Sequence, residues 1–236
     1  FREANVPSVR LDDYWNPFLD PKKVITNSIS LGTFERPGSV ILTGPNAGGK
    51  STNMKSVALA IMMGQAFGVA AARNVEMTPF TYLDTHMAKT DDISQEQSSY
   101  MCEALHMKEI IENLKALPEG KFGCVFMDEL FNTTNPDEAS AIGRSIGKYL
   151  AHRKNTMCII SSHYKIMTNL EQETGNVFEN YHVTVNKHSD GSISYPFQIE
   201  KGLTDKTVAL DILQHIGMEP EIVSGARALV GRGRRR

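Results

Sequence analysis

The chain has 236 residues and a formal net charge of −2. This length suits one sizeable α/β domain. The near-neutral charge argues neither for nor against a nucleic-acid partner, because most basic residues are dispersed along the chain. The polar start shows no secretory signal peptide, and the most apolar segment, residues 57–72, is too short to span a membrane.

The three cysteines, Cys102, Cys124 and Cys158, are too widely spaced for a metal or redox motif. Cys124 and Cys158 lie in apolar runs, where we expect them to be small buried hydrophobic side chains. These features favour an intracellular, reduced protein with no membrane partner. The chain begins with Phe1 rather than methionine, which suggests a piece of a longer protein.

The first part of the chain contains four prolines within residues 1–37, which predicts irregular structure with one or two edge strands. Within it, the segment from Val24 to Leu31 alternates apolar and polar residues, as a half-buried strand does. An apolar run then follows at residues 39–43. We predict that this run is a buried strand.

The next eight residues fit the pattern G-x-x-x-x-G-K-[ST], in which a glycine-rich turn between a strand and a helix binds phosphate. Glycines let backbone N–H groups approach phosphate oxygens, and the opening of the following helix, expected near Thr52, adds donors and positive dipole. Lys50 would reach the β- and γ-phosphates, and Ser51 would bind Mg²⁺. A chance glycine-rich loop is the alternative, expected about once in a hundred chains of this length. The predicted phosphate-loop residues are Gly44, Pro45, Asn46, Ala47, Gly48, Gly49, Lys50 and Ser51.

A second helix is predicted over residues 98–117. Ala104, Met107, Ile111 and Leu114 recur there at spacings of 3, 4 and 3, which is the period of an amphipathic helix. Its methionines are interpreted as core packing rather than as ligands.

Further strand-and-helix units follow. Residues 122–127 and 156–161 are short continuous apolar runs of the kind that parallel sheets bury on both faces. Between them, Asn135 and Pro136 predict a capped helix start, with Glu138 placed to reach back to the cap. The alternation of strands and helices indicates an α/β fold with a mostly parallel sheet and right-handed crossovers.

The last part of the chain is predicted to hold a hairpin and two helices. Residues 183–185 and 193–195 flank a turn at Asp190 and Gly191. Helices are expected over residues 208–216 and 220–230.

Two adjacent carboxylates, Asp128 and Glu129, end the strand at residues 122–127. Asp128 is the expected support for Mg²⁺, and Glu129 could orient and deprotonate an attacking water. A solvated acidic turn is the alternative for such a pair. His163 lies just beyond the next strand, where strand ends converge on a ligand crevice, so its imidazole could meet a γ-phosphate. A lone histidine is more often structural.

Ser98 opens the helix at residues 98–117. It could be an N-cap in a polar linker, or it could bind a phosphate presented from elsewhere.

Several motifs together resemble the ATPase domain of the MutS-type mismatch-repair proteins, which belong to the ABC class. Residues 43–52, including Thr52, look like their phosphate loop, and residues 98–103 like their signature element. Residues 127–130 are similar to their metal-binding strand, and residues 162–164 to their Thr-His-Tyr switch. Residues 209–213 and 220–223 resemble helices that help to pair subunits. The segment that contains Val24, Ile25 and Asn27 resembles the strand of these proteins that contacts the adenine.

The resemblance implies a P-loop ABC-type ATPase fold, with a mostly parallel central sheet, an antiparallel β portion and C-terminal helices. Residues 1–236 would form a single ATPase domain. Residues 1–37 would supply N-terminal strands on the adenine side, residues 38–200 the ATPase core, and residues 201–236 a helical dimerisation segment.

The implied function is Mg²⁺-dependent binding and hydrolysis of ATP, which controls a dimeric, DNA-associated mismatch-repair clamp. Glu129, His163 and Lys50 would be catalytic, and Ser51 and Asp128 would hold Mg²⁺. Ser98 would complete the ATP site of the partner subunit in a homodimer or MutS-like heterodimer. Double-stranded DNA, mismatched or branched, would be bound mainly by modules outside this chain.

Two departures from the family pattern leave an alternative open. Glu96 stands where the family usually has glycine, and residues 131–134 read Phe-Asn-Thr-Thr where it commonly has Gly-Arg-Gly-Thr. A carboxylate near a partner's triphosphate is unfavourable unless it points away. Glu96 and Asn132 therefore favour the alternative of a nucleotide-gated DNA- or partner-binding module with little hydrolysis.

Overall fold

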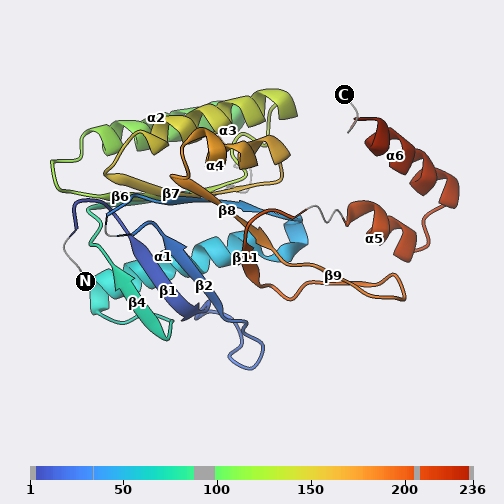
Figure 1. Ribbon diagram of the computed structural model, residues 1–236, viewed down its shortest axis with the longest axis horizontal. Helices are drawn as coiled ribbons and strands as arrows, with labels where there is room; N and C mark the ends of the chain where they lie inside the picture. Colours follow the sequence, from blue (N-terminus) through green and yellow to red (C-terminus); the bar gives the residue numbers. More distant parts are fainter. Residues whose placement is uncertain (1–3, 34, 88–98, 205–207, 234–236) are drawn as a thin grey trace.

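A computed structural model describes residues 4–33, 35–87, 99–204 and 208–233. It is built around a six-stranded sheet in the order β11-β8-β3-β7-β6-β5, in which every neighbouring pair is parallel except β11 and β8 (Figure 1). The predicted α/β class and mostly parallel sheet are therefore confirmed. The six strands are β3 (Ser39–Thr43), β5 (Tyr82–His86), β6 (Gly123–Asp128), β7 (Thr156–Ser162), β8 (Phe178–Val183) and β11 (Ile199–Lys201).

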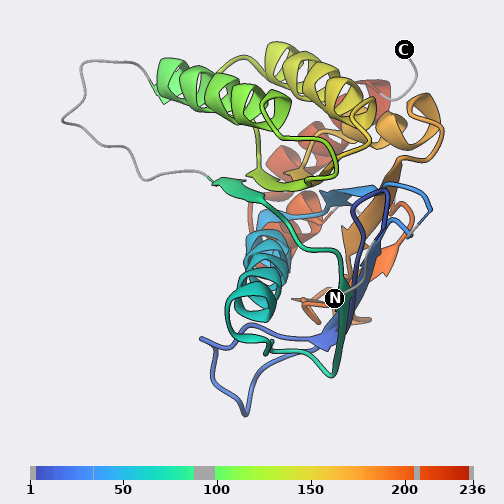
Figure 2. The ribbon, with the colours of Figure 1, turned by 90° about the vertical axis from the view of Figure 1, so that its left-hand side faces the viewer.

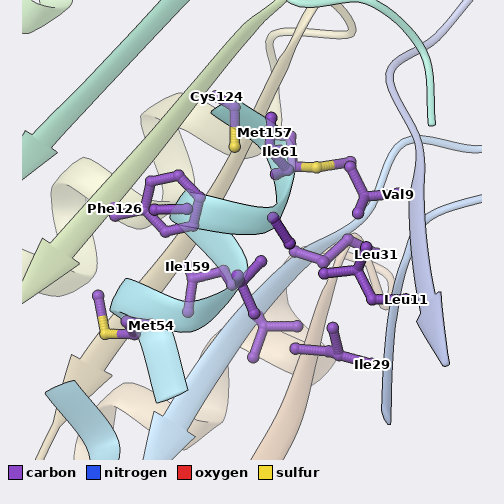
Figure 3. Close-up of a cluster of buried hydrophobic side chains, with 14 of the residues drawn as sticks. Val9, Leu11, Ile29, Leu31, Met54, Ile61, Cys124, Phe126, Met157 and Ile159 are labelled. Carbon is purple, nitrogen blue, oxygen red and sulfur yellow. The ribbon is translucent and has the colours of Figure 1, made fainter. Parts of the chain in front are cut away.

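A second sheet of three antiparallel strands, in the order β2-β1-β4, lies below the first in Figure 1. Its strands are β1 (Val9–Tyr14), β2 (Asn27–Leu31) and β4 (Asn74–Met77), and α1 (Lys50–Phe67) is packed between the two sheets. Figure 3 shows this core, a single buried cluster that includes Leu11 and Leu31 of the second sheet, Ile61 of the helix and Phe126 of the central sheet.

The strand predicted over Val24–Leu31 is shorter than expected, because residues 24–26 lie outside it. β2 pairs with β1 only from Asn27, opposite Tyr14, at an irregularity of β1 where Asp13 has a left-handed backbone (φ 51°). Residues 24–26 have no regular secondary structure, and a turn precedes them at residues 21–23, where the backbone N–H of Lys22 donates to the Asp20 carboxylate.

The opposite face of the central sheet is covered by α2 (Ser99–Lys115), α3 (Pro136–Ala151) and α4 (Leu170–Glu173), as Figures 1 and 2 show. Met107 and Leu114 are buried as predicted, so Met107 packs in the core, but the core packing predicted for the methionines is wrong for Met101, which is 47% exposed. Ile110 is also fully buried, whereas Ile111 is only partly covered. The buried side of α2 is therefore rotated slightly from the predicted stripe.

The predicted cap of α3 is confirmed, since the Asn135 side chain accepts a hydrogen bond from the Asp137 backbone N–H at 2.9 Å. The Glu138 carboxylate accepts a hydrogen bond from the Thr134 hydroxyl at 3.3 Å, so it reaches back to the residue before the cap. Cys124 and Cys158 are buried, and burial raises the pKa of both thiols, as expected for apolar packing rather than reactivity.

The C-terminal part differs from prediction in one detail. Residue 183 ends β8, so the hairpin is made by β9 (Asn186–Lys187) and β10 (Ile193–Ser194), closer to the turn than expected. The helices α5 (Ala209–His215) and α6 (Pro220–Gly233) follow. Within the described ranges, no helix combines the length and the apolar character that crossing a bilayer requires.

Candidate functional site

The predicted phosphate loop, carboxylate pair and His163 gather at one edge of the central sheet. In the parallel register, Thr43 at the end of β3 lies opposite Ser162 of β7, and Asp128 at the end of β6 lies opposite Ser161. The loops that follow these strands therefore leave the sheet side by side. The phosphate loop, the carboxylate pair and His163 belong to them.

The loop after β3 needs its glycines for two reasons. Gly44 has φ 137°, and a Cβ there would lie 2.2 Å from Cγ2 of Val183 on β8. Gly49, with φ 88°, occupies the position before the first residue of α1. A short 3₁₀ turn, η1 (Asn46–Gly48), connects them, and α1 begins at Lys50, two residues earlier than expected.

Lys50 is the most confined charge of this site, with a side chain that is 2% exposed. Its ammonium donates to the Gly44 carbonyl at 3.0 Å and to Asn46 Oδ1 at 3.1 Å. It also lies 3.3 Å from Oε1 of Glu129. A buried ammonium is tolerated only when it is paired and hydrogen-bonded in this way.

The two carboxylates after β6 have different surroundings. Asp128 accepts a hydrogen bond from the Ser161 hydroxyl of the neighbouring strand. Glu129 has a left-handed backbone (φ 49°), and its N–H donates to the Ser161 carbonyl at 3.2 Å. This backbone turn directs the Glu129 carboxylate to Lys50.

His163 Nδ1 lies 3.8 Å from Oε1 of Glu129, and its side chain is 43% exposed. The imidazole ring packs on Tyr164, with 4.1 Å between the ring centroids. The structure therefore brings together three residues that sequence reasoning placed at the γ-phosphate, namely Lys50, Glu129 and His163.

A cavity of about 340 Å³ adjoins the phosphate loop. Ala47 and Thr52 line it from the predicted loop, and Ile25 and Asn27 line it from the predicted adenine side. Val24 is not among its lining residues. Sequence reasoning missed the eight other lining residues, which carry no motif; among them are Tyr14, Trp15, Asn53 and Phe197.

Asn27 holds one wall of this cavity in place. Its side-chain amide donates to the Phe197 carbonyl at 3.0 Å and accepts from the Ile199 N–H at 2.8 Å. Phe197 has a left-handed backbone (φ 59°), and its ring lies next to Gly49, where an added Cβ would be 3.1 Å from Cδ1 of the ring. The aromatic wall is thus tied to β2 and placed beside the phosphate loop.

A second buried polar chain supports the floor of the cavity. The Tyr14 hydroxyl donates to Asn53 Oδ1 at 3.2 Å, and Asn53 Nδ2 donates to the Gly49 carbonyl at 3.1 Å. Burial raises the pKa of Tyr14, so its hydroxyl remains a proton donor.

Ser51 and Asp128 are the predicted metal-binding pair. No group of three or more His, Cys, Asp or Glu side chains in the part of the chain that the structure describes could hold a metal ion. A cation bound by Ser51 and Asp128 would therefore take its remaining ligands from phosphate and water, which is the coordination that Mg²⁺ favours. Ser98 and Glu96 lie outside the described residues.

This geometry defines an α/β protein with a glycine-rich loop, a buried lysine and two carboxylates at one sheet edge. A model of the family MutS domain V matches residues 40–232, and the chain belongs to that family. Over 212 residues it is 28% identical to the DNA mismatch repair protein MutS of Prochlorococcus marinus (strain NATL1A). It is 27% identical to the protein of the same name from strain NATL2A. Each alignment covers 90% of this chain and 22% of the relative, so the chain spans about a fifth of the curated relatives it matches.

Proposed function

We propose that this chain binds and hydrolyses ATP with Mg²⁺, as the P-loop ABC-type ATPase domain of a mismatch-repair protein. The observation that carries the proposal is the surrounding of Lys50. A buried ammonium lies between the carbonyl of the glycine-rich loop and a carboxylate from the next strand but one in the sheet. The Lys50 ammonium is thus held where phosphate oxygens can replace its neutral hydrogen-bond acceptors, the Gly44 carbonyl and Asn46 Oδ1.

The other residues of the edge supply complementary roles. Ser51 and Asp128 would hold Mg²⁺, which when bound neutralises phosphate charge. Glu129 accepts a proton from a water as the water oxygen bonds to the γ-phosphorus, and the bond to the bridging oxygen breaks to release ADP. His163, beside Glu129, contacts the γ-phosphate. The cavity beside Ala47 and Thr52 has an aromatic wall at Phe197, which suits a nucleobase.

The wider role follows from the names of the relatives and from the resemblance to their ATPase domain. We propose that ATP turnover controls an intracellular dimer, a homodimer or MutS-like heterodimer, that acts in DNA mismatch repair. Ser98 would complete the site of the partner subunit, and α5 and α6 would help to pair the subunits. Double-stranded DNA would be bound mainly by other parts of the assembly.

One observation favours a second function, a nucleotide-gated binding module with little hydrolysis. Oε1 of Glu129 lies 3.3 Å from Lys50, so this carboxylate is already paired rather than free to accept a proton. If nucleotide does not displace it, ATP would bind and act as a switch without turnover.

The single tryptophan, Trp15, lines the cavity and provides a direct test of binding. Titration of Mg·ATP should change its fluorescence, and Lys50→Ala should abolish the change. Glu129→Gln should bind ATP but reduce turnover by about 100-fold or more. Because the proposed site is composite, turnover should rise faster than linearly with protein concentration. Binding without turnover in the wild type would favour the second function, and no binding would overturn both.

A further inference from the structure

The loop after β6 has a strained backbone, and side chains of the helix α2 hold it in place. Glu129 and Phe131 have φ values of 49° and 58°, in the left-handed region that residues other than glycine rarely adopt. Such conformations persist only where surrounding contacts determine them, and they cluster at functional sites. The contacts that hold this loop therefore help to determine the position of the Glu129 carboxylate.

Glu103 of α2 provides two of these contacts. Its Oε1 accepts a hydrogen bond from the Phe131 backbone N–H at 3.2 Å, and its Oε2 accepts one from the Thr133 hydroxyl at 3.2 Å. Both carboxylate oxygens are thus used on the loop. One turn earlier on α2, the Tyr100 ring packs on the Phe131 ring, with 5.7 Å between centroids. Phe131 itself is 3% exposed, so its side chain and its backbone are both anchored to α2.

Glu103 is in turn held by His86, which is itself in contact with His106. Nε2 of His86, a residue that is 5% exposed at the end of β5, lies 3.4 Å from Oε1 of Glu103. His86 Nδ1 lies 3.1 Å from Nδ1 of His106, whose Nε2 is 3.6 Å from Oδ1 of Asp84. Hydrogen bonds join Glu103 to His86 and His86 to His106, and an ionic contact joins His106 to Asp84, so this chain of side chains ties Glu103 to β5.

We propose that Glu103 is a positioning residue for Glu129. From α2 it fixes the backbone of residues 129–133, so that the Glu129 carboxylate lies at Lys50 and beside His163. This inference rests on the proposed function, since it assigns a second residue to the same hydrolytic step. Among the residues that the structure describes, no contact of Glu103 involves the phosphate loop or the cavity, so its loss should slow turnover and leave nucleotide affinity unchanged.

The test compares the wild type with Glu103→Ala, and with Glu109→Ala as a matched control for an exposed carboxylate on the same helix. Glu103→Ala should lower kcat about 10- to 100-fold through misplacement of a reacting group, with an unchanged dissociation constant from Trp15 fluorescence. Glu109→Ala should change neither quantity. Thr133→Val removes one donor to Glu103 and should lower kcat about 2- to 10-fold, as the loss of one hydrogen bond implies.

A double-mutant cycle separates positioning from a general structural effect. In a Glu129→Gln background, Glu103→Ala should cause no further loss of single-turnover hydrolysis, because the group that it positions is already gone. A further loss there, an unchanged kcat in both single variants, or a parallel loss of nucleotide affinity would overturn the inference. If Glu103→Ala does not fold, Thr133→Val and Glu103→Gln carry the same test. A wild type without turnover would instead overturn the hydrolytic function and, with it, this inference.

Discussion

The loops after β3 and β6 leave the same edge of the sheet, and both contain residues with a left-handed backbone. The two loops differ in what stabilises that conformation. After β3 the left-handed residues are glycines, Gly44 and Gly49. After β6 they are Glu129 and Phe131, whose side chains disfavour that conformation. The first loop is determined by its own composition. The second depends on contacts from Ser161 and from Glu103 of α2.

This difference separates two kinds of functional loop. A glycine loop adopts its conformation at no steric cost, so its pattern is visible in the sequence. A loop held by distant side chains shows no local pattern, and its shape responds to whatever moves those side chains. In the proposed site, the loop after β6 is therefore the part whose shape depends on contacts from α2.

The largest expected effect is that of Gly44→Ala. The added Cβ would meet the buried Val183 side chain at 2.2 Å, and alanine at φ 137° is strained as well. Overpacking and strain together should lower the free energy of unfolding by about 4 kcal/mol. Chemical denaturation measures this change. Gly68→Ala is the control, because Gly68 also has a positive φ (71°) but nothing lies within 4 Å of its Cβ position. A loss of similar size at Gly68 would show that strain alone dominates.

The loop after β6 is tested by comparing Phe131→Ala with Phe131→Gly. Both lose a buried ring, which should lower the free energy of unfolding by about 3 kcal/mol. Alanine elsewhere is usually more stable than glycine, but at φ 58° the left-handed penalty falls on alanine. Phe131→Gly should therefore be about 1 kcal/mol more stable than Phe131→Ala in denaturant titrations. The opposite order would mean that this backbone is not left-handed in solution.

The loop after β3 is predicted well from the sequence because its own glycines determine its conformation. The strand at 39–43, the glycine turn and α1 are local in sequence; the strand and the turn are found where they were expected, and α1 begins only two residues earlier. Asp128 and Glu129 were placed correctly because a continuous apolar strand ends at them. The strand predicted from Val24 starts later because its pairing partner β1 bends at Asp13, which depends on tertiary pairing.

The remaining parts of the site join residues that are distant in sequence. Phe197 is held at the cavity by a hydrogen bond from Asn27, 170 residues earlier in the chain. Glu103 meets Phe131 across 28 positions, and His86 across 17. No periodicity or motif spacing encodes such contacts, so only the folded chain brings them together.

A third left-handed residue, Phe197, is also held by side-chain contacts, and Asn27→Ala tests it. The substitution leaves the Ile199 N–H without its 2.8 Å acceptor and should cost about 2 kcal/mol of stability. Because the aromatic wall is released, the dissociation constant for ATP should rise about tenfold, as measured by Trp15 fluorescence. Asn113→Ala, which removes an exposed amide on α2, should leave the constant unchanged. An unchanged constant in Asn27→Ala would remove Phe197 from nucleotide contact.

The smallest effect is expected at Asp13, a left-handed residue (φ 51°) at the surface. Its carboxylate accepts a hydrogen bond from Arg73 at 2.6 Å, and this contact raises the pKa of Arg73. Aspartate tolerates the left-handed region, and an exposed ion pair adds little, so Asp13→Gly should leave the thermal midpoint within about 2 °C of the wild type. Asp13→Ala loses the same ion pair but keeps the backbone penalty. It should therefore melt about 2–4 °C below Asp13→Gly, and equal midpoints would show that β1 relaxes at this bend without cost.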